Sequence, residues 1–182
     1  MIHGSRVTLR ALEEGDLERC WQWINDAEVT RYLGMLGVPV SLTQEREWLE
    51  GAVRHRDGYL MAIVAEDGTH IGNIGLHKPD WANRHAGLGI MIGNREYWGR
   101  GYGREAIQLL LGFAFGELGL NLVWLTVLDF NARAIRCYER VGFSHEGRQR
   151  QRVFREGEHH DLLLMSITSE EYEARATAAG GV

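Results

Sequence analysis

The stretch IMIGNREYWGRGYGR, residues 90–104, decides how the rest of the chain is interpreted. A short apolar run at residues 90–92 is typical of the end of a buried strand. Gly99, Gly101 and Gly103 follow, and an apolar stripe at helical spacing begins after them. Glycines leave backbone N–H groups accessible, and a helix N-terminus adds unpaired donors and a positive dipole end. The order strand, glycine loop, helix predicts a cradle for a phosphate or pyrophosphate, although the glycines alone fit a tight turn equally well.

The composition is that of a globular protein, since 45% of the 182 residues are hydrophobic. The length fits one domain over residues 1–182, with an alanine- and glycine-rich tail at 174–182 that we expect to fray. The formal net charge of −5 argues against nucleic-acid binding as the main role. Cys20 and Cys137 lie in apolar helical patterns, which indicates buried thiols in a reducing compartment. No window approaches 18 apolar residues and no signal region is present, so we expect a soluble cytoplasmic protein without membrane contact.

Apolar periodicity predicts seven strands and several helices. The strands cover residues 7–12, 59–65, 70–77, 85–93, 122–128, 143–155 and 158–167. The helices lie near residues 17–24, 41–53, 104–118 and 131–141, and at most one short helix fits around residues 27–33. Residues 78–83 are predicted to form a loop. Helices follow strands regularly only in the second half, so the sheet is mixed rather than regularly wound and parallel. The excursion between the first strand and residue 58 is a candidate substrate-facing flap.

Two nucleotide-binding motifs fail on spacing. A P-loop requires Gly-x-x-x-x-Gly-Lys-Ser/Thr, and the dinucleotide fingerprint requires Gly-x-Gly-x-x-Gly with an acidic residue about twenty positions later. The glycine spacing here is Gly-x-Gly-x-Gly, and no acidic residue stands near position 123. What the chain offers is a combination: YWGRGYGREA at residues 97–106, a predicted strand, then NARAIRCYERVGF at residues 131–143.

This combination closely resembles the GNAT superfamily of acyl-CoA-dependent N-acyltransferases. Within it, the chain looks most like the branch of ribosomal-protein N-terminal alanine acetyltransferases and spermidine acetyltransferases. The resemblance covers residues 5–168, and the later Glu146-Gly147-Arg148 and the hairpin with Gly157 and Asp161 fit that branch. It implies an α/β (α+β) fold with a mixed, mostly antiparallel seven-stranded sheet, helices on both faces, and acetyl-CoA as the cofactor.

The resemblance also implies where the cofactor binds. In the family pattern Gln/Arg-x-x-Gly-x-Gly/Ala, Gly101 and Gly103 match the glycines, whereas Trp98 replaces the first residue. Since the family holds the pyrophosphate through main-chain N–H groups, this departure should matter little. A bulge near residues 91–93 would separate that strand from the strand at 122–128, admit the pantetheine arm, and aim one N–H at the thioester carbonyl. The implied cofactor-binding residues are Met91, Ile92, Gly93, Gly99, Arg100, Gly101, Tyr102, Gly103, Arg104 and Asn131.

Two residues of the helix at 131–141 have implied roles. Asn131 matches the asparagine that contacts the cofactor arm, and it is also a good helix N-cap, which is compatible. Tyr138 matches the tyrosine credited with protonating the departing thiolate. A phenol pKa of about 10 is close enough to that of a thiol for this transfer. The alternative for Tyr138 is a core residue with its hydroxyl at the rim.

The resemblance leaves the general base unassigned. Many relatives carry glutamate in the strand before the glycine loop, but Gly87 stands at that position. The candidates nearby are His85, His77 and Asp80, each of which also fits a solvated rim residue. No histidine or cysteine spacing predicts a metal site.

The acceptor is expected between the early helical excursion and the far end of the cofactor slot. The aromatic candidates for its walls, which also fit a core role, are Trp21, Trp23, Tyr32, Trp48, Trp81 and Tyr97. Arg148, Arg150 and Arg152 stand at period 2. They fit either a solvated strand edge or a rim that attracts an acidic acceptor or the 3′-phosphate of the cofactor.

We therefore expect an N-acetyltransferase that moves an acetyl group from acetyl-CoA to a primary amine by direct attack in a ternary complex. The amine belongs to a protein N-terminus or to a small molecule, and the use of a longer acyl group stays open. The alternative is a CoA-binding sensor or partner module with weak or no turnover, which Gly87 favours and Tyr138 opposes. Neither nucleic acid nor membrane is an expected partner, and whether the chain forms a homodimer stays open.

Overall fold

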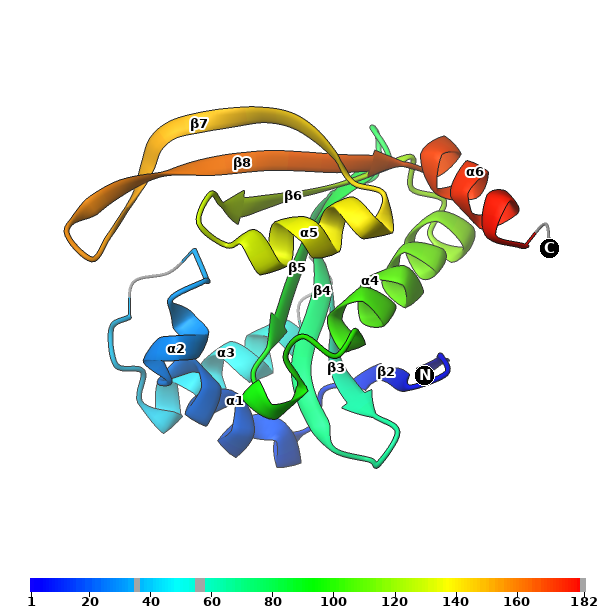
Figure 1. The fold of residues 1–182 in the computed structure, drawn as a ribbon. Coiled ribbons are helices and arrows are strands. Elements are labelled where there is room, and N and C mark those ends of the chain that lie inside the picture. The colour runs from blue at the N-terminus through cyan, green and yellow to red at the C-terminus, as the bar shows by residue number, and fades with distance from the viewer. Residues whose placement is uncertain (35–36, 55–57, 181–182) are drawn as a thin grey trace.

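Eight strands form one sheet within residues 1–34, 37–54 and 58–180, the part of the chain that this computed structural model describes (Figure 1). Their order is β1-β2-β3-β4-β5-β6-β8-β7, and all neighbours are antiparallel except β5 and β6. The strands are β1 Ile2–His3, β2 Val7–Ala11, β3 Gly58–Ala65, β4 His70–Asp80, β5 His85–Ile92, β6 Leu122–Leu128, β7 Ser144–Arg155 and β8 Glu158–Thr168. The mixed, mostly antiparallel sheet expected from the sequence is confirmed, with one strand more than the seven expected.

Helices cover both faces of the sheet (Figure 1). On one face lie α4 Tyr102–Gly112 and α5 Ala132–Val141, and on the other lie α1 Leu17–Ile24 and α3 Leu42–Arg54. The remaining helical segments are α2 Ala27–Thr30, α6 Ser169–Gly180, the short turns η1 Glu14–Asp16 and η2 Arg95–Tyr97, and the π-helical turn η3 Phe113–Glu117. None of the helices described is long and apolar enough to cross a membrane.

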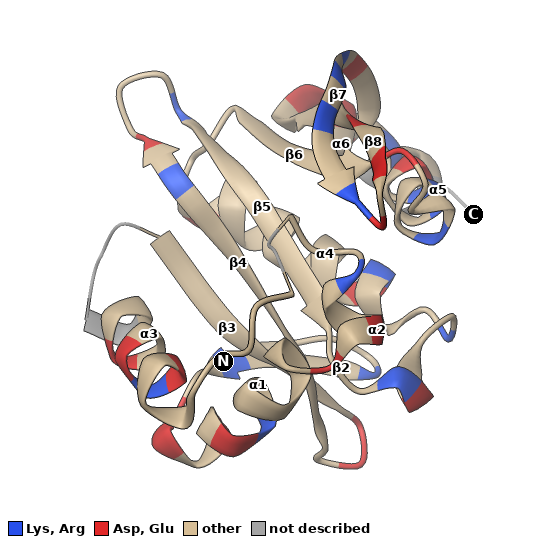
Figure 2. Ribbon diagram, turned by 90° about the vertical axis from the view of Figure 1, so that its left-hand side faces the viewer, with Lys and Arg blue, Asp and Glu red and all other residues tan. Residues whose placement is uncertain are grey.

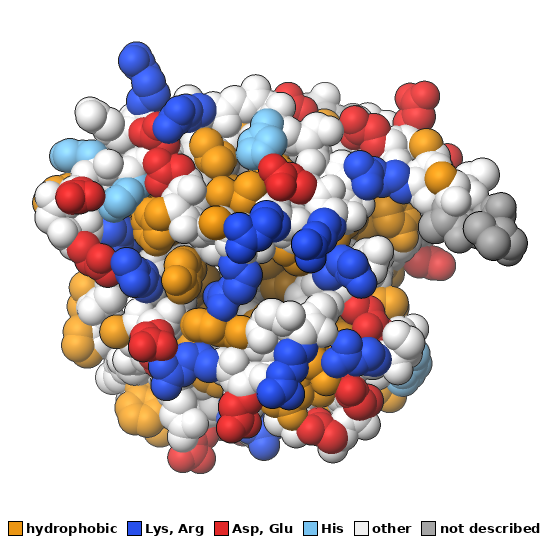
Figure 3. All heavy atoms as spheres, viewed as in Figure 1, with side chains coloured by type: hydrophobic (Ala, Val, Ile, Leu, Met, Phe, Trp, Pro, Cys, Tyr) orange, Lys and Arg blue, Asp and Glu red, His pale blue; other side chains and the backbone are white. Residues whose placement is uncertain are grey.

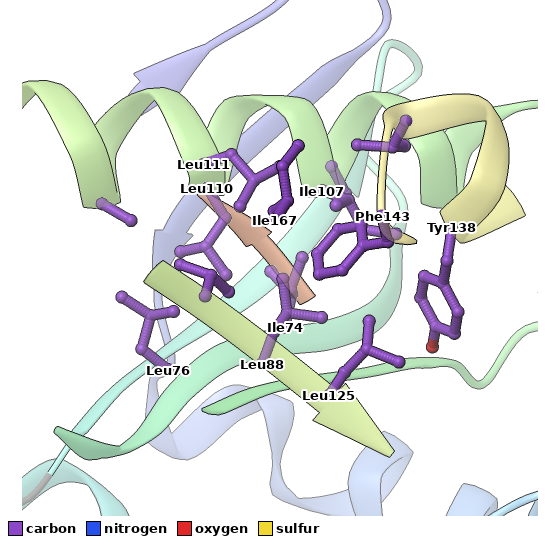
Figure 4. Packing of buried hydrophobic residues seen from close by; sticks show 14 of the residues in the cluster. Ile74, Leu76, Leu88, Ile107, Leu110, Leu111, Leu125, Tyr138, Phe143 and Ile167 are labelled. Carbon is purple, nitrogen blue, oxygen red and sulfur yellow. The ribbon is translucent and has the colours of Figure 1, made fainter. Parts of the chain in front are cut away.

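The larger core cluster fixes α4 on the sheet. Ile107, Leu110 and Leu111 of α4 are at most 1% exposed and pack on strand side chains that include Ile74 and Leu88 (Figure 4). Burying such side chains stabilises the fold by roughly 1.5–3 kcal/mol each. The glycine loop that precedes α4 is therefore held at a fixed place beside the sheet.

Three elements differ from the sequence expectation. β1 is a two-residue edge strand paired with β2, too short to show an alternating pattern. β4 continues through Pro79 to Asp80, where the sequence predicts a loop, because Lys78 adopts a left-handed φ of 49° and the register shifts there. Residues 174–180, for which no helix is expected from the sequence, belong to α6, since the alanines favour a helix, and residues 181–182 lie outside the described part.

β5 and β6 separate soon after they pair. Their register includes His85 with Leu122, Ala86 with Val123 and Gly87 with Trp124, and ends there among the described residues. β5 continues for five more residues along β4, in regular register to its last residue. The irregular step expected near residues 91–93 follows, where the N–H groups of residues 93 and 94 both donate to the Ile71 carbonyl, at 2.9 and 3.0 Å. The parallel pair therefore opens as the resemblance implied.

Candidate active site

A cavity of about 700 Å³ occupies the opening between β5 and β6. Most of the implied cofactor-binding residues line it, namely Met91, Ile92, Gly99, Arg100, Gly101, Gly103, Arg104 and Asn131. Gly93 and Tyr102 are not among its described lining residues. Gly93 packs on the Trp23 indole, where an added Cβ would lie 2.0 Å from Trp23 Cδ2. Tyr102 is 5% exposed and its hydroxyl donates to Glu66 at 2.9 Å.

The glycine loop has the conformation that its sequence predicts. Gly99 and Gly101 adopt φ values of 72° and 91°, a left-handed region that side chains disfavour. Gly101 is the N-cap of α4, and no side chain in the described part of the chain caps that terminus through a hydrogen bond. The first N–H groups of α4 therefore remain available to an anion. Trp98 braces the loop, since its indole N–H donates to the Ile92 carbonyl at 2.7 Å.

Arginines surround the same end of the cavity. Arg100 and Arg104 come from the loop and α4, and Arg133, Arg136 and Arg140 come from α5, all with exposed side chains. Figure 3 shows basic side chains gathered around a hollow on this face. The guanidinium of Arg133 also lies 3.9 Å above the Trp98 ring. Left-handed glycines, an open helix N-terminus and several arginines together suit a polyanion such as the pyrophosphate and 3′-phosphate of CoA.

Sequence reasoning missed the α5 arginines. They stand at i, i+3 and i+7 on one helix face, a spacing visible in the sequence that also fits a solvated surface. The arginines of β7 were considered instead, yet Arg148, Arg150 and Arg152 are not among the described lining residues. The register of β7 also shifts between residues 149 and 153, so their expected alternation is interrupted.

Asn131 and Tyr138 both lie on α5 and reach the cavity. The side chain of Asn131 accepts a hydrogen bond from the Ala134 N–H at 3.2 Å, so the N-cap role is confirmed. Tyr138 is 8% exposed and packs beside Phe143, and its hydroxyl lies at the edge of the apolar cluster (Figure 4). Burial, with a smaller contribution from Cys137, raises the pKa of Tyr138. The hydroxyl therefore carries its proton at neutral pH and holds it more tightly than an ordinary phenol, whose pKa is about 10.

The three candidate bases separate in space. His77 lines the cavity and lies across the sheet from Gly87, with its ring 5.3 Å from the Trp124 ring. His85 Nε2 lies 3.8 Å from Asp80 Oδ2 where β4 and β5 end their pairing, and neither residue is a described lining residue. Only His77 of the three candidates is thus placed beside the cavity by the residues described.

The far end of the cavity is mostly apolar, and the Arg133 guanidinium borders it, 5.3 Å from the centre of the Tyr32 ring. Its walls are Val29 and the two residues 32–33 after α2, together with Leu128 and Leu162 from β6 and β8. The excursion after the first strand therefore contributes to the wall, as predicted for the flap. The tip of the β7–β8 hairpin adjoins it, since Arg31 pairs with Glu156 at 3.1 Å.

Most aromatic candidates for the acceptor wall lie elsewhere. Tyr32 and Tyr97 line the cavity, but Trp23 is a core residue at 9% exposure. Trp21 donates its indole N–H to the Val40 carbonyl at 2.8 Å. Trp48 and Trp81 are exposed, and neither is among the described lining residues. Tryptophan content alone therefore does not locate this wall.

Comparison with known proteins supports the same cofactor. The family model described as acetyltransferase (GNAT) domain matches residues 6–144. The putative ribosomal N-acetyltransferase YdaF of Bacillus subtilis (strain 168) is 34% identical over 92% of this chain and 93% of its own. The spermidine N(1)-acetyltransferase of Escherichia coli (strain K12) is 30% identical over 96% of this chain and 92% of its own.

A solved structure has the same fold. The spermidine N-acetyltransferase from Vibrio cholerae in complex with CoA and spermine superposes with a TM-score of 0.87 and 27% identity, covering 93% of this chain and 99% of that one. The cavity of the present structure, with its glycine loop and ring of arginines, opens where β5 and β6 part. The chain belongs to the GNAT family and is an acetyl-CoA-dependent N-acetyltransferase.

Proposed function

We propose that the acceptor is a primary amine, on a protein N-terminus or on a small molecule, and that it attacks acetyl-CoA directly in a ternary complex. One observation carries this proposal: a single cavity joins the arginine-rich end to the apolar end through the opening between β5 and β6. Both substrates can therefore meet without an acyl-enzyme intermediate. Relatives named as ribosomal and spermidine acetyltransferases act on amines, which supports this acceptor class.

Acetyl-CoA supplies the activated thioester, and the chain supplies its position. The N–H groups of residues 99–104 would hold the pyrophosphate, with Arg136 and Arg140 on the opposite wall. The backbone of Met91 and Ile92 would run beside the pantetheine arm, and one of its N–H groups would polarise the thioester carbonyl. Asn131, already the cap of α5, would border the same arm.

Tyr138 is the proposed general acid. The amine nitrogen forms a bond to the acetyl carbon, the C–S bond breaks, and the electron pair stays on sulfur. The Tyr138 hydroxyl gives its proton to that thiolate and is restored from solvent. Its place on the cavity wall, on the α5 side of the sheet, agrees with this role.

The test is thiol release from acetyl-CoA with a panel of N-terminal peptides, aminoglycosides and polyamines, against a reaction without amine. We expect amine-dependent release with at least one class, and mass spectrometry should locate the acetyl group on nitrogen. Tight CoA binding with no release above the amine-free rate would instead support the CoA-binding module and overturn the proposal. A burst of acetylated enzyme before product would overturn direct attack.

A further inference from the structure

His77 stands on the side of the sheet opposite Tyr138. Its neighbour Leu76 and the facing Leu88 belong to the core cluster beneath α4 and α5, which also contains Tyr138. Because side chains alternate along a strand, His77 and its partner Gly87 face the other side, toward α1–α3. The two groups thus approach the opening from its two sides.

The bare backbone of β5 makes room for the imidazole. A Cβ added at Gly87 would lie 2.2 Å from His77 Cε1, and at Gly89 it would lie 3.7 Å from His77 Cδ2. The first distance is shorter than any real Cβ contact, so the ring occupies the space of a side chain at position 87. The edge of Trp124 meets the ring with an interplanar angle of 89°. The observed position of the His77 ring therefore requires glycine at position 87.

The ring also lies where the sheet opens. Gly87 with Trp124 is the last pair described between β5 and β6, and His77 is the β4 residue that faces this pair. Beyond it the cavity begins, lined by His77, Thr126 and Tyr138 from three different elements. His77 thus lines the cavity from the α1–α3 side of the sheet, whereas Tyr138 lines it from α5.

We propose that His77 is the general base, accepting the proton that the acceptor amine loses as it attacks. This rests on the proposed acetyl transfer. As the N–C bond forms and the C–S bond breaks, the proton on nitrogen moves to an imidazole nitrogen, directly or through one water. Tyr138 gives a proton to the leaving sulfur, and the imidazolium returns its proton to solvent. Charge and protons balance without another reactant.

The surroundings of the ring keep it in the basic form. Desolvation lowers the pKa of His77, the positive charge of Lys78 adds to this, and a backbone hydrogen bond to Leu88 opposes it. The residues of β5 and β6 shown beside the ring are Gly87, Gly89 and Trp124, which do not titrate. The imidazole is therefore neutral at pH 7 and able to accept a proton.

The test compares two histidines of the same hairpin. His77→Gln should lower kcat roughly 10²–10⁴-fold, leave the Kd for CoA within about twofold, and remove the acid limb that a histidine gives the pH profile of kcat. His85→Gln is the matched control, since it removes a histidine outside the cavity, and it should retain both rate and profile. Unchanged kcat and acid limb in a folded His77→Gln variant would overturn the proposal.

A second variant separates catalysis from packing. Gly87→Glu alone should displace the ring and lose activity. His77→Ala with Gly87→Glu puts a carboxylate into the vacated space, and should recover part of kcat with an acid limb shifted to lower pH. If the kcat of the double variant were no higher than that of His77→Ala, His77 would be a packing residue and not the general base. If the wild type shows no amine-dependent thiol release, the proposed function fails, and this role with it.

Discussion

The two ends of the cavity are built from different parts of the chain. Beside α4 and α5, the first turn of α4 and five arginines line the space where we propose that the phosphates of CoA bind. Beside α2 and β8, the walls are apolar or aromatic, with Val29, Leu33, Leu128 and Leu162. We therefore expect the first end to recognise the charge that all CoA thioesters share, and the second end to distinguish one acceptor from another.

The described lining residues are positively charged or neutral, and none carries negative charge. Among the lining residues that the structure describes, none is Asp or Glu. Asp26 and Glu28, which precede the lining residue Val29, share a basic partner, since Arg95 approaches Asp26 at 3.5 Å and Glu28 at 2.5 Å. Figure 2 shows other acidic residues on α1 and α3, helices outside the cavity wall. The proposed acceptor end thus offers apolar contact and, among its described lining residues, no carboxylate for a polycation.

The largest expected effect lies between the two ends, at Tyr138. Tyr138→Phe removes only the hydroxyl, so the ring still packs beside Phe143. We expect kcat to fall roughly 10²–10⁴-fold because the thiolate then leaves without a proton donor. The Kd for CoA, measured by calorimetry, should change less than twofold. An unchanged kcat, with chemistry shown to limit the rate, would exclude Tyr138 from the mechanism.

A buried ion pair stands at the start of α1, the helix that precedes α2 in the chain. Arg10 of β2 donates two hydrogen bonds to Asp16, at 2.6 and 2.8 Å, and His70 Nδ1 lies 3.1 Å from the same carboxylate. The ring of Trp23 on α1 packs edge-on against the His70 ring, with 4.8 Å between the ring centroids. This network therefore holds α1 on the sheet. Asp16→Asn should therefore destabilise the fold by about 2–3 kcal/mol, since Arg10 is partly solvated.

The network also predicts the direction of pH dependence. Burial opposes ionisation of Asp16, but Arg10, the Glu13 N–H and His70 outweigh it and lower its pKa. Burial lowers the pKa of His70 below its ordinary 6.5, against the effects of Asn73 and Asp16. The unfolded chain therefore binds protons more readily at both groups, and stability is lost as pH falls below about 6.5 and again below about 4.

Urea unfolding from pH 8 to pH 3 measures both effects. The stability difference between the wild type and Asp16→Asn should shrink in the most acidic range, where Asp16 is protonated. In active samples, the KM for the amine should rise more than the Kd for CoA. Equal rises in the KM for the amine and the Kd for CoA, or a free energy of unfolding that increases toward acidic pH, would contradict this account of α1.

A smaller effect is expected from the charge of the acceptor. Spermidine carries several positive charges into a cavity with five arginines and no described carboxylate. Its kcat/KM should be at least about 10-fold below that of a peptide with a single free amine and an apolar side chain. Leu162→Glu should raise the relative rate with spermidine, and Leu162→Gln is the uncharged control. If the wild type preferred spermidine, the acceptor end would attract positive charge in spite of its apolar walls.

Local patterns predicted the cofactor end well. The glycine loop, the start of α4 and the Asn131 cap all follow from residues close together in sequence. The opening between β5 and β6 was also anticipated, through the resemblance. Helix periodicity likewise placed the apolar face of α5 inward, but it could not show that the opposite arginine face borders the cavity.

Contacts between neighbouring strands, and between a helix and the sheet, could not be predicted from such local patterns. The match between His77 and Gly87 depends on the register of the whole β4–β5 pair, which is set by both strands and the turn between them. The need for glycine at position 93 likewise comes from Trp23 of α1, far away in sequence. Such packing depends on how elements meet and not on any single pattern.

The smallest expected effect tests the arginine end. Arg136→Ala removes one exposed cation from the α5 wall, and exposed ion pairs contribute only about 0.2–1 kcal/mol. The Kd for CoA should therefore rise roughly 1.5- to 5-fold at low salt, and the difference should narrow as ionic strength screens the charge. Arg150→Ala on β7 is the control, since it removes an exposed arginine outside the cavity lining and should leave the Kd unchanged. Equal effects of the two substitutions would mean that overall charge, and not the α5 wall, attracts the cofactor.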